Sequence, residues 1–138
     1  MGSSQAEHAE VIEGSPAACL EALLDFESYP EWQTAVQDVT VREDGAVEFR
    51  VDAKVRTIRY VLRYHAEPPS RLWWEYVEGD ARDVSGEYLL DDLGDGTTRA
   101  TYRLDIDPGR FVPGPVRKLL TEGVMRSSVR DLKRRVEG

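Results

Sequence analysis

Apolar residues recur at every second position through most of residues 39–106, and this period constrains the fold more than any other feature of the chain. The cleanest run is residues 47–56, where five apolar side chains alternate with five charged ones. Such alternation predicts antiparallel strands with one face buried and the other in water. Turn signals separate the runs, among them Asp44-Gly45, Pro68-Pro69 and Gly79-Asp80. We therefore expect about six successive strands in this region.

Two segments have the helical period instead. The first follows Ser15-Pro16, because serine is a good N-cap and proline is tolerated at the first helical position. Its apolar stripe is Cys19, Leu20, Leu23 and Leu24. The second helix covers roughly the last 20 residues, and its first stripe is Val116, Leu119, Leu120, Gly123 and Val124. A glycine inside a helix usually has a packing reason, so we expect Gly123 to approach the sheet closely or to leave room for a ligand.

The order of these elements predicts the architecture. Residues 5–13 are short and mixed, and we interpret them as a first strand. A sheet and a helix that each have one apolar face bury it most economically against one another. We therefore predict an α+β fold in which a curved antiparallel sheet of about six to seven strands wraps around a long C-terminal helix. The length of 138 residues indicates one domain, residues 6–138, after a flexible leader of residues 1–5.

The composition excludes several classes of protein. No apolar run approaches the roughly 20 residues of a membrane span, so we expect no stable membrane insertion. The single cysteine, Cys19, excludes an internal disulfide and fits a cytoplasmic protein, in which it is expected to be a small core residue. The net charge is −8, and residues 113–138 hold seven basic against three acidic side chains. The rest of the chain is therefore strongly acidic, which disfavours nucleic-acid binding.

Residues 25–32 lie between the first helix and the strands and form the sequence Asp-Phe-Glu-Ser-Tyr-Pro-Glu-Trp. Because the residue before a proline is disfavoured in the helical region, we expect Pro30 to stop a helix from passing through and to lie in a turn. Two large aromatic residues, Tyr29 and Trp32, flank this proline where small polar residues would be usual. We expect them to cover an apolar space, with Trp32 at its mouth.

Tyrosines dominate the apolar phase of four successive strands. A dry core favours Leu, Ile and Val, because a buried phenol needs a hydrogen-bond partner. Several phenols under one helix therefore favour a small-molecule cavity over a filled core, in which they would bond to one another or to water. The residues expected to line this cavity are Trp32, Phe49, Val51, Tyr60, Leu62, Tyr64, Trp74, Tyr76, Tyr88, Tyr102, Leu104, Leu120 and Val124.

No motif for catalysis accompanies these residues. His8 and His65 do not have the spacing of a metal pair, so we predict no metal site and no cofactor. Ser127-Ser128 has no recognisable base, and the catalytic residues stay unassigned. Trp73 and Val77 are apolar in the outward phase, which fits scattered exposed residues and leaves a homodimer contact open.

The pattern D-x-x-x-Y-P-x-W in residues 25–32, preceded by Ser15-Pro16, resembles the START-like (SRPBCC, helix-grip) superfamily. Within it, the chain is similar to the polyketide cyclase/dehydrase and lipid-transport group that includes the coenzyme Q-binding proteins. The order of elements matches this group from about residue 6 to residue 136. The resemblance implies a helix-grip fold and a cavity between the sheet and the C-terminal helix that binds a hydrophobic or aromatic small molecule.

Three functions follow from these observations. The first is the binding or transport of a hydrophobic small molecule such as a lipid, a quinone or a polyketide, without catalysis. The second is a polyketide cyclase or aromatase that acts on an aromatic polyketide. The third is a protein-interaction module that uses the basic final helix, although these charges also suit the acidic body of the chain itself.

Overall fold

The computed structural model of the protein describes residues 6–52, 57–107, 109 and 114–138, and for residues 114–120 it describes the backbone only. Three predictions lie outside these described residues. They are the leader at residues 1–5, the inward direction of Ala53 and Val55, and the side-chain positions of Val116, Leu119 and Leu120.

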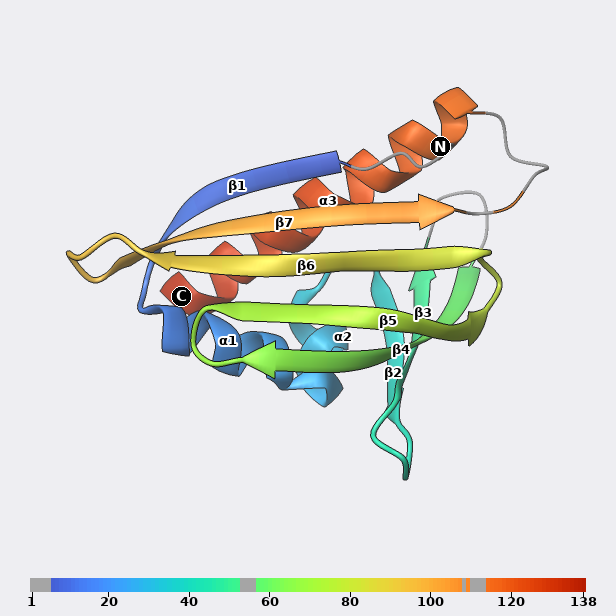
Figure 1. The fold of residues 1–138 in the computed structure, drawn as a ribbon, viewed down its shortest axis with the longest axis horizontal. Coiled ribbons are helices and arrows are strands. Elements are labelled where there is room, and N and C mark those ends of the chain that lie inside the picture. Colours follow the sequence, from blue (N-terminus) through green and yellow to red (C-terminus); the bar gives the residue numbers. More distant parts are fainter. Residues whose placement is uncertain (1–5, 53–56, 108, 110–113) are drawn as a thin grey trace.

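The described residues form seven strands in one antiparallel sheet, as the alternation predicts. The strands are β1 (Ala6–Glu13), β2 (Val36–Val41), β3 (Val47–Asp52), β4 (Thr57–Glu67), β5 (Arg71–Gly79), β6 (Asp83–Asp92) and β7 (Thr97–Asp107). Their order in the sheet is β1-β7-β6-β5-β4-β3-β2, so the first two strands of the chain are the two edges. Register shifts interrupt the pairing at Val36/Asp38 and at Val61/Leu62. Because such irregularities bend and twist strands, they contribute to the curl of the sheet (Figure 1).

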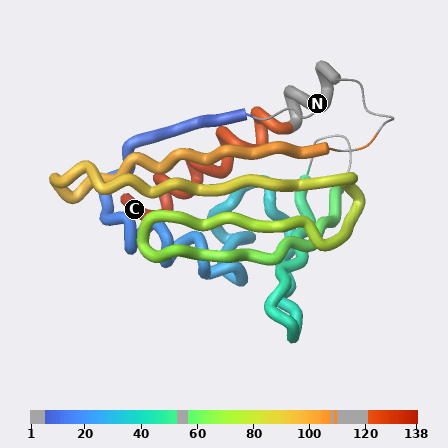
Figure 2. Tube along the Cα trace, viewed as in Figure 1, coloured from blue at the N-terminus to red at the C-terminus, as the bar shows by residue number. Residues whose placement is uncertain are grey.

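The helices lie on the concave side of this sheet. The long helix α3 (Gly114–Glu137) packs along β1 and β7, and it also touches α1 (Pro16–Leu24) and α2 (Tyr29–Trp32). Figure 2 shows its trace running beside the strands at one side of the sheet while the two short helices lie toward the other. The fold is thus α+β, a helix-grip arrangement, as predicted. Among the described helices, none is both long and apolar enough to cross a membrane.

The first helix begins where the sequence predicts. The side chain of Ser15 accepts a hydrogen bond from the backbone nitrogen of Ala18 at 3.1 Å, and Pro16 is the first helical residue. Cys19, Leu20 and Leu23 are buried, whereas Leu24 is exposed. Burial raises the pKa of the Cys19 thiol, which favours its neutral form and agrees with a core role for this residue.

No continuous helix passes through residues 25–32, as predicted, since α1 ends at Leu24, but Pro30 lies in a short helix and not in a simple turn. Residues 26–32 form two short helical segments, a 3₁₀ turn over Phe26–Ser28 and then α2. Tyr29 has helical backbone angles although it precedes Pro30. The physical reason is that Pro30 stands in the first turn of α2, where its missing N–H leaves no intrahelical hydrogen bond unmade. The proline therefore begins a helical turn instead of preventing one.

The expectation for Gly123 is also wrong. Gly123 is exposed on α3, and a Cβ built on it would meet no atom within 4 Å. It neither approaches the sheet closely nor makes room in the interior. A glycine on the solvent side of a helix gains no packing contact to offset its loss of conformational entropy on folding. Gly123 therefore lowers the stability of α3.

The outer face of the sheet has rows of ion pairs. Arg42 and Arg59 both contact Glu48 and Glu78, and Arg71 and Arg103 both contact Glu87. Trp73 lies on this face, stacked against His65 and with the guanidinium of Arg71 4.2 Å from the centre of its ring. The outward aromatic residue is thus covered by neighbours of its own chain.

Basic residues of the final helix also pair within the chain. Lys133 donates to the backbone oxygen of Val11 at 2.7 Å and contacts Glu137 at 2.6 Å, and Arg134 contacts Asp131. Part of the positive charge of α3 is therefore paired with carboxylate and carbonyl groups of the same chain.

Candidate functional site

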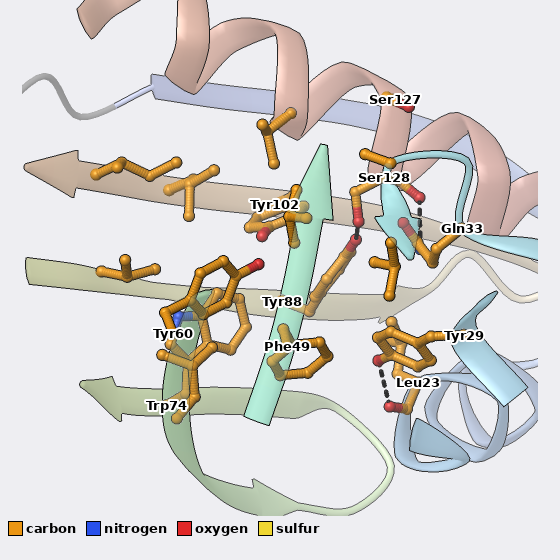
Figure 3. A pocket seen from close by; sticks show the side chains of 18 of the residues that line it. Leu23, Tyr29, Gln33, Phe49, Tyr60, Trp74, Tyr88, Tyr102, Ser127 and Ser128 are labelled. Atoms are coloured by element: carbon orange, nitrogen blue, oxygen red, sulfur yellow. Dashed lines mark hydrogen bonds between the residues drawn. The ribbon is translucent and has the colours of Figure 1, made fainter. Parts of the chain in front are cut away.

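A small cavity lies between the concave face of the sheet, α3 and the segment that carries α2. Its volume is about 60 Å³, and its walls come from β2 to β7, the end of α1, and α2 with the residues that follow it. Figure 3 shows the aromatic rings of the sheet on one side of this space and the side chains of α3 on the other. Because ligand pockets commonly measure about 300–1,000 Å³, the rings of this wall must move before a molecule of several rings can enter.

The sheet side of the cavity is a continuous cluster of aromatic rings. The ring centres of Tyr64 and Trp74 are 5.3 Å apart, those of Phe49 and Tyr60 are 5.4 Å apart, and those of Tyr88 and Tyr102 are 4.3 Å apart. These residues lie on five adjacent strands, β3 to β7. They share one face of the sheet, because strand side chains alternate between its two faces. The sheet thus supplies an apolar wall that is edged with phenol hydroxyls.

Polar groups gather where α3 meets β6. The hydroxyl of Tyr88 lies 2.8 Å from the Oγ of Ser128, and the side-chain amide of Gln33 donates to the backbone oxygen of Ser128 at 3.3 Å (Figure 3). Ser127 also lines the cavity. Hydroxyl and amide groups at one end of an apolar space can accept or donate hydrogen bonds to a ligand and fix its orientation.

A buried carboxylate lies next to this polar end but outside the cavity. Asp131 follows Ser128 by three residues on α3, and its side chain accepts a hydrogen bond from the backbone nitrogen of Thr34 at 2.8 Å. Its other oxygen pairs with Arg134. Asp131 is 2% exposed, yet it does not line the cavity. It therefore fastens the segment after α2, which includes Gln33, to the final helix.

Tyr29 fastens the same segment to the first helix. Its hydroxyl donates to the backbone oxygen of Leu23 at 2.5 Å, and its ring packs against Phe26, Trp32 and Phe49. The residue lines the cavity as well as closing the turn. The segment of residues 25–32 thus reaches the cavity through Tyr29.

The tyrosines of the cavity are neutral phenols. Burial is the main cause that raises the pKa of Tyr29, Tyr60, Tyr64, Tyr88 and Tyr102 above the usual value near 10. A phenol with a raised pKa keeps its proton at neutral pH, so these side chains can donate hydrogen bonds but do not act as bases.

The described residues that line the cavity carry no ionised side chain. They are apolar, aromatic, amide or hydroxyl residues, and neither His8 nor His65 is among them. The two histidines instead contact Glu10 and Glu75 at 3.0 Å. In the part of the chain that the structure describes, no three His, Cys, Asp or Glu residues are grouped so that they could hold a metal ion.

Most of the predicted lining residues do surround the cavity, and two do not. Those that line it are Phe49, Val51, Tyr60, Leu62, Tyr64, Trp74, Tyr88, Tyr102, Leu104 and Val124. Tyr76 lies outside, because its hydroxyl donates to the backbone oxygen of Ala81 at 2.5 Å in the turn after β5. Trp32 donates to Ser28 at 2.9 Å and lines an open surface groove beside Arg134 and Arg135 instead. The side chain of Leu120 is not among those described.

Sequence reasoning missed the polar residues of the site. Gln33 directly follows the segment of residues 25–32. Ser128 follows Val124 by four residues, so Val124 and Ser128 lie on one face of α3. The spacing from Val124 was therefore a usable signal for Ser128. No period marks Gln33, since it stands in a connection between a helix and a strand.

Comparison with known proteins places the chain in a family. The family model described as polyketide cyclase/dehydrase and lipid transport matches residues 4–137. No curated protein has a significant sequence match to the chain.

Solved structures share the fold at low sequence identity. A START superfamily protein from Mycobacterium smegmatis has a TM-score of 0.86 and 19% identity, with 96% of this chain and 97% of that chain covered. The Zhui aromatase/cyclase from Streptomyces sp. R1128 has a TM-score of 0.81 and 20% identity, over 96% and 93% of the two chains. The di-domain aromatase/cyclase BexL has a TM-score of 0.75 and 13% identity, over 96% of this chain and 46% of that one. With its family model matched over almost the whole length and its helix-grip fold shared with START proteins, the chain belongs to the polyketide cyclase/dehydrase and lipid transport family.

Proposed function

We propose that this protein binds a hydrophobic small molecule, such as a lipid, a quinone or a polyketide-like compound, in the cavity between the sheet and α3, and that it acts as a carrier. The observation that carries the proposal is the distribution of polarity in the cavity. Apolar and aromatic side chains form the walls, while Gln33, Ser127, Ser128 and the hydroxyl of Tyr88 gather at one end. A binding pocket needs only this small number of placed polar groups to orient a ligand.

The uncharged character of the described lining residues supports a carrier over an enzyme. General acid–base catalysis is most efficient when the pKa of the catalytic side chain lies near the working pH. The tyrosines of the cavity have raised pKa values, and no His, Asp or Glu stands among the described lining residues. The single buried thiol of Cys19 also suits a reducing, cytoplasmic location.

The test measures whether the protein binds members of a defined panel of apolar compounds, and it compares the wild type with two variants in which a valine is replaced by phenylalanine. Extraction and mass spectrometry of the purified protein should find a bound apolar compound, and thermal unfolding should shift with a member of a lipid, quinone and fused-ring ketone panel. At a ligand concentration of a hundred times Kd the stabilisation should reach about 2.7 kcal/mol. Val124→Phe fills the cavity and should abolish the shift, whereas Val77→Phe on the outer surface should preserve it. A wild-type protein with no extracted compound and no shift across the panel would refute the proposal.

A polyketide cyclase or aromatase is the second candidate. Its support is the similarity of the fold to Zhui and BexL, both of which are described as aromatase/cyclases. Neutral phenols such as those of Tyr60 and Tyr102 would serve as proton donors to an enolate oxygen. Turnover of a poly-β-ketone surrogate that falls in Tyr60→Phe or Tyr102→Phe would favour this function. Turnover equal to the buffer background would exclude it for that surrogate.

A further inference from the structure

The indole nitrogen of Trp74 has no hydrogen-bond partner among the described residues, although the side chain is only 5% exposed. Trp74 lies on β5 and lines the cavity. Figure 3 shows its ring among the other aromatic rings of the cavity wall. Most buried polar atoms in proteins are paired, because an unpaired donor loses its hydrogen bonds to water and gains none in return. A ligand that brings a hydrogen-bond acceptor to the indole nitrogen of Trp74 would therefore satisfy this donor.

The position of this indole is fixed by its neighbours. Gly86 is the partner of Trp74 on β6, and a Cβ at position 86 would lie 2.8 Å from the Cζ2 of Trp74 and would also collide with the backbone oxygen of Arg103. Only glycine thus lets the ring lie against β6. Tyr64 and Tyr102 pack on the indole with ring centres 5.3 and 5.6 Å away. These contacts fix the ring in a position where its N–H has no hydrogen-bond partner among the described residues.

The lining of the cavity restricts the chemistry of the acceptor. No lysine, arginine or histidine lies among the described residues that line it. A carboxylate or a phosphate would be buried there without a compensating cation, which is strongly unfavourable. A carbonyl oxygen is neutral and accepts hydrogen bonds, so it suits both the unpaired donor and the uncharged wall.

We propose that the Nε1–H of Trp74 donates a hydrogen bond to a neutral carbonyl oxygen of the ligand and selects ring ketones over hydrocarbons and over carboxylates. This inference rests on the proposed binding function and names the class of ligand for it. The cavity of about 60 Å³ must widen before the ligand reaches the indole. Tyr60 and Tyr64 are the half-buried tyrosines of the wall, so the cavity widens by movement of these rings.

The experiment compares three probes with one carbon skeleton: tetralin, α-tetralone and tetralin carboxylate. Binding of each is measured by calorimetry for the wild type, for Trp74→Phe, which keeps an aromatic ring but removes the N–H, and for one control. The control is Trp73→Phe, which changes the neighbouring tryptophan on the outer face in the same way. The wild type should bind α-tetralone about tenfold more tightly than tetralin, as expected for one hydrogen bond to an otherwise unpaired donor. The carboxylate should bind least.

Trp74→Phe should bind α-tetralone and tetralin equally, and Trp73→Phe should keep the preference of the wild type. A preference that survives in Trp74→Phe, or one that Trp73→Phe abolishes, overturns the assignment to Trp74. Equal binding of α-tetralone and tetralin by the wild type overturns the inference and leaves the carrier function standing. Failure of the wild type to bind any probe, together with failure of the lipid and quinone panel, overturns both.

A second measurement on the wild type is independent of whether Trp74→Phe folds. The indole proton of Trp74 is followed by nuclear magnetic resonance during titration with α-tetralone and with tetralin, after assignment with Trp32→Phe and Trp73→Phe. A downfield shift with α-tetralone alone supports the hydrogen bond. An unmoved indole proton at saturation contradicts it.

Discussion

The hydroxyl of Tyr88 on β6 lies 2.8 Å from the Oγ of Ser128 on α3, so a hydrogen bond joins the sheet to the final helix at the edge of the cavity. Tyr88 and Ser128 are 40 residues apart in sequence. Their contact marks the polar end of the site and also contributes to the packing of α3 on the sheet.

A double-mutant cycle at these two positions should show coupling. Tyr88→Phe and Ser128→Ala each remove one hydroxyl, and each should lower the free energy of unfolding by about 1 kcal/mol because the remaining hydroxyl loses its partner. The double variant should cost less than the sum of the single changes, with a coupling of about 1 kcal/mol. Urea unfolding of the four proteins measures this. Additive effects would mean that the hydrogen bond contributes nothing to stability.

Asp131→Ala should destabilise the protein by about 2 kcal/mol, since the backbone nitrogen of Thr34 then loses its charged acceptor, the buried carboxylate of Asp131. Asp131→Asn keeps an oxygen that can accept from Thr34 and should cost less. Arg134→Ala is the matched control, because Arg134 is exposed and an exposed ion pair contributes less than about 1 kcal/mol. Thermal and urea unfolding provide the comparison. An equal cost for Asp131→Ala and Arg134→Ala would show that the ion pair, not the bond to Thr34, matters.

Two glycines should respond to alanine in opposite directions. Gly123→Ala should stabilise the protein by about 0.5–1 kcal/mol, because the new methyl group meets nothing and the helix gains a better helix former. Gly86→Ala should destabilise it, because the methyl group would overlap the backbone oxygen of Arg103 and approach the ring of Trp74. The midpoint of thermal unfolding reports both effects. A destabilised Gly123→Ala would contradict the exposed position of residue 123.

Stability should fall steeply at alkaline pH. Buried tyrosines have pKa values raised above 10 in the folded protein, whereas in the unfolded chain they ionise near pH 10. Below that pH both states are protonated and the contribution is fully present. As the pH rises past about 10, only the unfolded chain releases these protons, so the free energy of unfolding falls by about 1.4 kcal/mol per pH unit for each tyrosine.

The absorbance of the phenolate checks this prediction. Tyrosine ionisation should coincide with the loss of circular dichroism, and Tyr88→Phe should reduce the slope of stability against pH by one group. Ionisation of all tyrosines near pH 10 in a protein that stays folded would be the contrary result.

The alternation of apolar residues in the strands determined the inward face of the sheet. Residues such as Phe49, Tyr60 and Trp74 could be assigned to the cavity from their phase alone, because a strand side chain can point only to one of two faces. Ser15-Pro16 fixed the start of the first helix through local hydrogen bonding, which involves no distant residue. Local patterns were therefore sufficient for the strands, the first helix and the helix-grip order of elements.

Only the tertiary structure decided which of the inward residues meet at the site. Tyr76 has the same phase as Trp74, yet it bonds to Ala81 beyond the cavity, and Trp32 bonds to Ser28 and faces a surface groove. Gln33 and Ser128 are 95 residues apart and show no shared pattern, but the packing of α3 brings them into contact. The unpaired nitrogen of Trp74 likewise depends on Gly86 and on rings from other strands. The reason is physical: a strand's period sets a direction for each side chain, whereas distances between elements are set by how helices and strands pack together.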